Sequence, residues 1–252
     1  MKNKLIAGNW KMNNSVSETK SLLTKLLPLI KDTPNSVVVC VPFTDIYAAG
    51  QLLKKSNVSL GAQNVHWKNS GAYTGEISAN MLSEAEVTYV IVGHSERRQY
   101  FNDTDETVNG KLKAALNAGL TPIMCIGESL NQREQGVTEA FLATQLEQGL
   151  KEITAEEAQK IVFAYEPIWA IGTGVTASAK EAQDTIKFVR KQIASLYGED
   201  VAQKVYILYG GSMNDANAFS LLNMPDIDGG LIGGASLSAE KFAAIIRAVE
   251  EK

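Results

Sequence analysis

Eight short apolar segments recur along the chain and constrain its fold more than any other feature. They are rich in Val, Ile and Leu, and longer amphipathic stretches separate them. The segments span residues 4–8, 37–41, 58–62, 89–93, 122–126, 161–165, 205–209 and 230–233. Apolar strands that alternate with helices indicate parallel strands covered by helices. Eight such units in 252 residues predict an α/β fold, a closed (β/α)8 barrel with eight parallel strands surrounded by helices.

Capping signals mark several helix starts between these segments. Three residue pairs have the spacing of a capping box: Ser15 with Glu18, Asp103 with Glu106, and Ser178 with Glu181. The chain contains no linker, low-complexity tract or change of composition. Residues 1–252 are therefore expected to form a single domain.

Charge and apolar content argue against several classes of partner. The chain has 24 basic and 28 acidic residues, and its net charge of -4 disfavours nucleic acid, so an anionic ligand must be held by local fields. No apolar stretch approaches the ~20 residues of a membrane span, and the first residues do not resemble a signal peptide. We expect a cytoplasmic protein without a membrane partner. Cys40 and Cys125 lie inside apolar segments and form no metal-ligand motif, so they are expected to be buried.

Polar residues and glycines follow the segments, where the carboxyl ends of the strands would lie. In a (β/α)8 barrel these ends form one surface, and that surface carries the active site. The residues concerned are Asn9, Trp10, Lys11, His94, Ser95, Glu96, Arg97, Arg98, Glu166, Gly210, Gly211, Ser212, Gly233, Gly234, Ala235 and Ser236. A carboxylate, an imidazole, a cation and two glycine-rich turns are thus expected to converge.

Glu166 directly follows the sixth segment and precedes a lid-like stretch. A carboxylate at the mouth of a strand, beneath a loop that can close over it, is a typical arrangement for a buried general base. The simpler alternative is a surface acid before a turn made by Pro167. The lid is expected to comprise Pro167, Ile168, Trp169, Ala170, Ile171, Gly172, Thr173, Gly174, Val175, Thr176 and Ala177.

The two glycine-rich turns after the seventh and eighth segments indicate a phosphate site. Glycines at positions 210, 211, 233 and 234 let backbone N–H groups approach an anion without a side chain in the way. Barrels commonly bind phosphate after these two strands. Residues 172–177 also match G-x-G-x-x-A, but they do not directly follow a strand, as a dinucleotide fingerprint would. No nicotinamide cofactor is implied.

Five motifs together resemble the triosephosphate isomerase family. They are AGNWKMN at 7–13, VGHSERR at 92–98, AYEPIWAIGTG at 164–174, YGGS at 209–212 and GGASL at 233–237. They follow the family's order along the whole chain. The resemblance implies interconversion of dihydroxyacetone phosphate and glyceraldehyde 3-phosphate through an enediolate, in glycolysis and gluconeogenesis, with no metal and no cofactor.

The resemblance also assigns roles to individual residues. Glu166 matches the base and His94 the electrophile; a helix beginning at Ser95 would lower the pKa of His94 and keep the ring neutral. Lys11 matches a fixed cation, Asn9 a supporting donor, and Glu96 pairs with Lys11 or holds the start of the helix. The residues implied in substrate and phosphate binding are Asn9, Lys11, Gly172, Ser212, Gly233 and Gly234.

Several neighbouring residues are expected to be structural. Trp169 is interpreted as a lid anchor, and the resemblance pairs its indole with Glu128. Trp10 is expected to fill core space, and Arg97 and Arg98 to form ion pairs with nearby acids. His66 is expected at the surface or in an interface. Val175 stands where the family often has lysine, a departure expected to affect lid movement rather than chemistry.

The connection from Gln63 to about residue 78 exceeds the ~2 to 6 residues of an ordinary strand-to-helix loop. It carries Trp67 and Tyr73, which a solvated loop would not need. An interface is the natural explanation, and the resemblance implies a homodimer with Tyr73, Thr74 and Gly75 at the tip of the loop.

Two other functions remain open from the sequence. A Schiff-base aldolase would need a desolvated lysine on a strand inside the barrel. A non-catalytic phosphate-binding or scaffold barrel would keep the glycine turns without needing a base beneath a lid. The presence of all the catalytic positions favours the isomerase.

Overall fold

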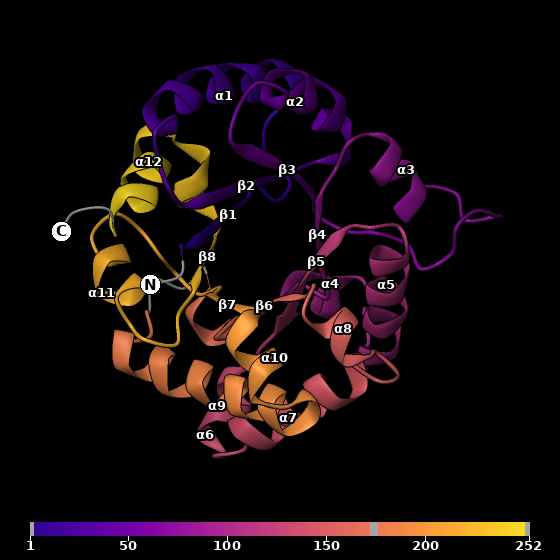
Figure 1. Ribbon diagram of the computed structural model, residues 1–252, viewed down its shortest axis with the longest axis vertical. Coiled ribbons are helices and arrows are strands. Elements are labelled where there is room, and N and C mark those ends of the chain that lie inside the picture. The colour runs from indigo at the N-terminus through magenta and orange to yellow at the C-terminus, as the bar shows by residue number, and fades with distance from the viewer. Residues whose placement is uncertain (1–2, 172–175, 250–252) are drawn as a thin grey trace.

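A computed structural model describes residues 3–171 and 176–249. Within these residues eight parallel strands pair in chain order and close into a barrel, because β1 also pairs with β8 (Figure 1). The strands are β1 (Leu5–Asn9), β2 (Ser36–Val41), β3 (Val58–Ala62), β4 (Tyr89–Val92), β5 (Thr121–Ile126), β6 (Val162–Tyr165), β7 (Tyr206–Tyr209) and β8 (Gly229–Ile232). Each overlaps one of the eight apolar segments, so the predicted barrel is confirmed.

Helices form the outer ring of the barrel (Figure 1). The α-helices are α1 (Val16–Ile30), α2 (Ile46–Leu53), α3 (Ala79–Glu84), α4 (Ser95–Tyr100), α5 (Asp105–Asn117), α6 (Leu130–Glu134), α7 (Thr138–Gly149), α8 (Ala155–Ala158), α9 (Ala179–Tyr197), α10 (Glu199–Lys204), α11 (Ala218–Leu222) and α12 (Ala239–Arg247). The 3-10 helices are η1 (Phe43–Asp45), η2 (Ile168–Ala170) and η3 (Gly234–Leu237).

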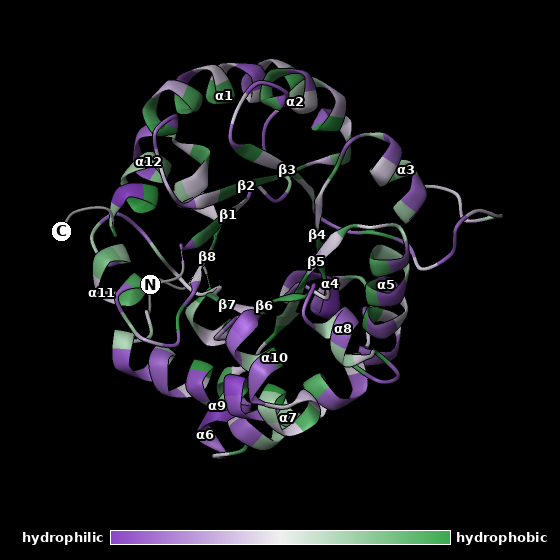
Figure 2. Ribbon diagram, viewed as in Figure 1, coloured by the Kyte–Doolittle hydropathy of each residue, from purple (hydrophilic) through white to green (hydrophobic). Residues whose placement is uncertain are grey.

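Successive strand residues face two separate apolar cores, as the two-residue period of a strand requires. One set fills the barrel interior: Leu5, Ala7, Val38, Cys40, Ile91, Ile123, Cys125, Val162, Ala164, Leu208 and Leu231. The alternate residues, such as Ile6 and Val39, pack against the helices. In Figure 2 the helices carry alternating hydrophobic and hydrophilic bands, as expected for helices with one buried face. Cys40 and Cys125 are both buried, as expected, and burial raises the pKa of the Cys40 thiol to about 12.

Two of the three predicted capping boxes are present. The backbone N–H of Ser15 donates to Glu18 at 2.8 Å, and that of Ser178 donates to Glu181 at 2.9 Å. The third prediction was wrong by one residue, because Thr104 caps α5. Asp103 instead accepts hydrogen bonds from the buried ammonium of Lys111 at 2.7 Å with both oxygens.

The segment between β3 and α3 projects from the barrel beside α3 and α5 (Figure 1). Within it, Tyr73 is 42% exposed and Trp67 is 40% exposed. His66 is only 6% exposed, and the centroid of its ring lies 4.2 Å from that of Trp67 and 4.4 Å from that of Tyr73. The alternative that placed His66 at the surface was therefore wrong, because two neighbouring rings cover it.

Candidate active site

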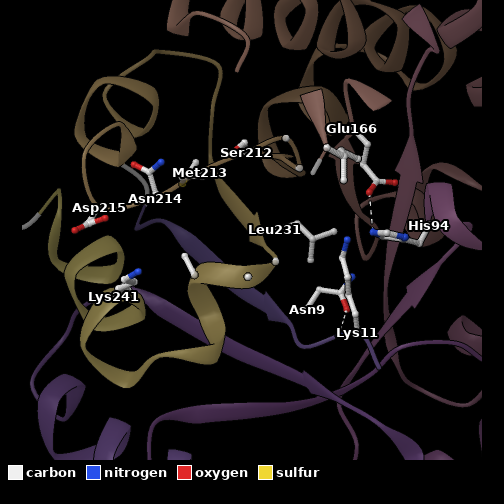
Figure 3. Close-up of a pocket in the computed structure, with 16 residues that line it drawn as sticks. Asn9, Lys11, His94, Glu166, Ser212, Met213, Asn214, Asp215, Leu231 and Lys241 are labelled. Atoms are coloured by element: carbon white, nitrogen blue, oxygen red, sulfur yellow. Dashed lines mark hydrogen bonds and ion pairs between the residues drawn. The ribbon is translucent and has the colours of Figure 1, made fainter. Parts of the chain in front are cut away.

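A cavity of about 370 Å³ lies at the carboxyl ends of the strands (Figure 3). Five parts of the chain that are distant in sequence meet around it. Its lining residues are Asn9, Lys11, His94, Glu166, Ile171, Gly210, Gly211, Ser212, Met213, Asn214, Asp215, Leu231, Gly233, Gly234, Ala235 and Lys241. The convergence expected from a parallel barrel is confirmed. Met213, Asn214, Asp215 and Lys241 were not singled out from the sequence.

Glu166 occupies the floor of this cavity because it directly follows β6. Its side chain is 2% exposed. One oxygen, Oε1, lies 2.9 Å from Nε2 of His94, and the other accepts a hydrogen bond from the Ser95 N–H at 2.9 Å. Burial raises the pKa of Glu166, but His94, the Ser95 N–H and Lys11 lower it further than burial raises it. The net pKa is lowered, so the buried carboxylate is ionised at neutral pH.

His94 is the N-cap of α4, and its tautomer follows from its two contacts. The backbone N–H of Glu96 donates to Nδ1 at 3.2 Å. Because a backbone N–H can only donate, Nδ1 carries no proton, and Nε2–H is the group that donates to Glu166. This hydrogen-bond geometry is that of an imidazole protonated at Nε2, with the proton pointing at Glu166.

The pKa of His94 differs from the sequence-based expectation. Burial lowers it, whereas the carboxylates of Glu166 and Glu96 raise it, and the net direction is upward. The predicted downward shift was wrong for this arrangement. A helix of six residues contributes a partial charge, while Glu166 places a full charge 2.9 Å from the ring.

Lys11 lies just beyond β1 and is held in an uncommon backbone conformation. Its φ angle is 53°, a left-handed value that is unusual for a residue other than glycine. The Asn9 side chain accepts from the Lys11 N–H at 3.0 Å, and the Gln63 side chain donates to its carbonyl at 2.9 Å. Its Nζ lies 2.6 Å from Oε1 of Glu96, so the predicted Lys11–Glu96 pair is present. Gln63 was missed as a site residue, because the sequence indicated only the start of a long loop there.

The two glycine-rich turns differ in how much space surrounds their glycines. A β-carbon at Gly210 would lie 2.9 Å from Cγ of Glu166, so this glycine is needed for packing. A β-carbon at Gly234 would meet nothing within 4 Å, which leaves its backbone open toward the cavity. Gly233, Gly234 and the nearby Ser212 all line that end of the cavity. Gly172, the fourth expected phosphate ligand, lies outside the described residues.

The described part of the lid is anchored through Trp169. Its indole N–H donates to Oε1 of Glu128 at 2.8 Å, and the hydroxyl of Tyr165 donates to the same atom at 3.1 Å. The guanidinium carbon of Arg133 lies 4.4 Å from the centroid of the Trp169 ring. The expected Trp169–Glu128 contact is therefore present. Gly172, Thr173, Gly174 and Val175 lie outside the described residues.

The remaining predictions near the site concern structural side chains. Trp10 is fully buried, as predicted. Arg97 pairs with Asp103 at 3.3 Å and Arg98 with Asp105 at 2.6 Å, which confirms their expected ion pairs. Within residues 3–171 and 176–249, no group of three His, Cys, Asp or Glu side chains is placed to hold a metal ion. In the same residues no helix is long and apolar enough to cross a membrane.

Comparison with known proteins identifies the family. The family model described as triosephosphate isomerase matches residues 4–249. The chain belongs to the triosephosphate isomerase family. It is 54% identical to triosephosphate isomerase of Clostridium botulinum (strain Loch Maree / Type A3) over 246 residues, which cover 98% of this chain and 99% of the relative.

Two further relatives support the assignment. Triosephosphate isomerase of Caldanaerobacter subterraneus subsp. tengcongensis is 51% identical, with 98% of this chain and 99% of the relative covered. The crystal structure of triosephosphate isomerase from Bartonella henselae superposes with a TM-score of 0.90 at 38% identity, covering 99% of this chain and 100% of the other.

Proposed function

We propose that the chain interconverts dihydroxyacetone phosphate and glyceraldehyde 3-phosphate, with Glu166 as the base and His94 as the electrophile. It is an aldose–ketose isomerase of glycolysis and gluconeogenesis. One observation carries the assignment: a buried, ionised carboxylate lies 2.9 Å from the imidazole Nε2 at the floor of a cavity with an open glycine backbone. Moving a carbonyl to the adjacent carbon needs a base for a C–H proton and a donor for the oxygen.

The reaction starts with an exchange of contacts. Both oxygens of Glu166 are occupied, one by the Ser95 N–H and one by His94. A substrate oxygen takes the Nε2–H bond of His94, which frees Glu166 and removes the hydrogen bond to Glu166 that helps to raise the pKa of the ring. Glu166 then removes the C–H proton next to the carbonyl and returns it to the neighbouring carbon. His94 moves a proton between the two oxygens of the enediolate.

Other residues stabilise the charges that develop. Lys11 supplies a cation that Glu96 orients, and Asn9 supports the Lys11 backbone and supplies a side-chain donor. The phosphate occupies the end of the cavity at Ser212, Gly233 and Gly234, held by backbone N–H groups; the resemblance adds Gly172. Closure of the lid excludes water, which strengthens these interactions and protects the intermediate.

The assembly proposed is a homodimer in which the loop with Tyr73, Thr74 and Gly75 enters the partner subunit. The loop projects from the barrel (Figure 1), and it exposes the rings of Trp67 and Tyr73. Exposed aromatic side chains on a projecting loop are typical of interface anchors. We also propose that residues 1–252 act as one domain and that the reaction takes place in the cytoplasm, because phosphorylated trioses are charged and do not cross membranes.

The aldolase and scaffold alternatives predict different surroundings for the lysine and the carboxylate of the cavity. A Schiff-base lysine must be desolvated to lose its proton, whereas Lys11 is 29% exposed at its side chain and pairs with Glu96. A non-catalytic scaffold barrel does not need a buried carboxylate such as Glu166. Burying a carboxylate costs free energy unless the group is hydrogen-bonded.

The test is a coupled assay for glyceraldehyde 3-phosphate conversion with purified protein, run with and without a chelator. We expect activity in both. Glu166→Asp withdraws the carboxylate by about one methylene, which can cost ~100-fold or more in rate. Glu147→Asp is the matched control, because Glu147 is exposed on α7 and outside the cavity. A Glu166→Asp variant with near-parent turnover would mean that another group is the base.

A further inference from the structure

Lys241 and Asp215 line the end of the cavity that lies away from Glu166 and His94 (Figure 3). They come from different elements: Asp215 follows β7, and Lys241 lies in the first turn of α12. Both side chains are exposed. Ser212, which follows one of the glycine turns, lies between this pair and Glu166 in Figure 3, and Gly233 and Gly234 line the same cavity. An incoming phosphate therefore meets Lys241 and Asp215 on its way to the glycine backbone.

The charge balance of the protein gives Lys241 more influence than an ordinary surface lysine. The chain carries a net charge of -4, so at long range it repels a phosphate dianion. Lys11, the other lysine of the cavity, is paired with Glu96 at 2.6 Å. In the part of the chain that the structure describes, Lys241 makes no ion pair. Its positive charge is therefore not cancelled by a carboxylate in direct contact.

We propose that Lys241 guides the phosphate group of the substrate into the cavity and that Asp215 opposes it. The choice of triose phosphate as substrate rests on the proposed function. Lys241 is a positioning residue for binding, because it stands at the opposite end of the cavity from the reacting groups. Its effect is long-range and so depends on salt: the screening length is ~30 Å at 0.01 M ionic strength and ~3 Å at 1 M.

The experiment compares Lys241→Gln, Lys241→Glu and Asp215→Asn with the parent enzyme. Lys191→Gln is the matched control, because Lys191 is an exposed lysine of α9 that does not line the cavity. Two quantities are measured as ionic strength rises: kcat/KM for glyceraldehyde 3-phosphate, and the Kd for inorganic phosphate.

At low ionic strength Lys241→Gln should lower kcat/KM about threefold to tenfold and weaken phosphate binding similarly, with kcat nearly constant. Lys241→Glu should lower kcat/KM and weaken phosphate binding further. Asp215→Asn should raise kcat/KM and tighten phosphate binding. The differences should vanish in ~1 M salt, where charges at this distance are screened. Lys191→Gln should match the parent throughout.

The inference is overturned if Lys241→Gln matches Lys191→Gln at low ionic strength, or if the two charge changes at 241 and 215 act in the same direction. A loss that persists in high salt would also overturn it, since that would indicate a local contact. An inactive parent would refute the proposed function alone. In that case the phosphate Kd values still decide whether Lys241 guides the anion.

Discussion

Replacing Gly210 with alanine should disable the base through a steric contact. The added β-carbon would lie 2.9 Å from Cγ of Glu166 and 3.1 Å from the carbonyl oxygen of Tyr165. Carbon atoms in contact normally lie ~3.5 to 4.0 Å apart, so Glu166 must move by roughly 0.6 to 1.1 Å. The backbone cannot give way easily, because the Gly210 N–H donates to that Tyr165 carbonyl at 2.7 Å.

A displacement of this size has a calculable effect on rate. A misplacement of ~1 Å can cost ~100-fold, which corresponds to ~2.7 kcal/mol in the activation free energy. We expect kcat of Gly210→Ala to fall about 30- to 100-fold. The free energy of unfolding should fall by only ~1 to 3 kcal/mol, the usual cost of overpacking. Steady-state kinetics and urea unfolding measure the two quantities separately.

Gly50→Ala is the control for this substitution. A β-carbon at Gly50 would lie 3.5 Å from Leu60 in ordinary contact, and Gly50 lies within α2, where alanine is favoured by ~1 kcal/mol. Its kinetics should match the parent. If Gly210→Ala kept kcat within about threefold of Gly50→Ala, the position of the base would not depend on Gly210, and the reasoning from this contact would be refuted.

Three further predictions concern other parts of the molecule. His94→Asn should lower kcat roughly 10²- to 10⁴-fold and move the acidic limb of the kcat/KM profile to higher pH, because the ring lowers the pKa of the base; an unmoved limb would contradict this coupling. Tyr73→Asp with Thr74→Arg should abolish the dimer, since burying unpaired charge costs several kcal/mol; sedimentation showing an intact dimer would remove the loop from the interface. Lys111→Met should lower the free energy of unfolding by ~1 to 3 kcal/mol, because the buried Asp103 carboxylate loses its Lys111 hydrogen bonds and keeps the ion pair with Arg97. Lys113→Met, at an exposed ion pair, should cost less than ~1 kcal/mol in urea unfolding.

The barrel could be predicted because each strand is a short apolar run between longer amphipathic stretches. The cavity could be predicted because the carboxyl ends of parallel strands meet on one face of a barrel, where Lys11, His94 and Glu166 follow their strands. The first residue of a helix is harder to predict from sequence where two adjacent residues are both good N-caps. Asp103 and Thr104 both suit a cap, and only the position of Lys111 decides that Asp103 serves an ion pair instead.

The residues missed at the site are those whose role depends on packing between distant segments. Lys241 is an ordinary exposed helical lysine in the sequence, and its place on the cavity wall depends on how α12 is set against the turn after β7. Gln63 reaches the Lys11 carbonyl across 52 positions of sequence. The pKa of His94 likewise depends on the rotamer of the Glu166 side chain. No local sequence pattern specifies that rotamer.

Pairing between β1 and β8 joins the first strand to the last, with Leu5 opposite Gly229 and Gly8 opposite Ile232. On the ribosome β1 is made first, and its partner emerges only after more than two hundred further residues. At ~5 to 20 residues per second that interval is on the order of 10 to 45 seconds. Throughout it the nascent sheet keeps an unpaired edge, which is a template for joining other chains. Until the final strand is translated, this edge is therefore a surface that chaperones can protect.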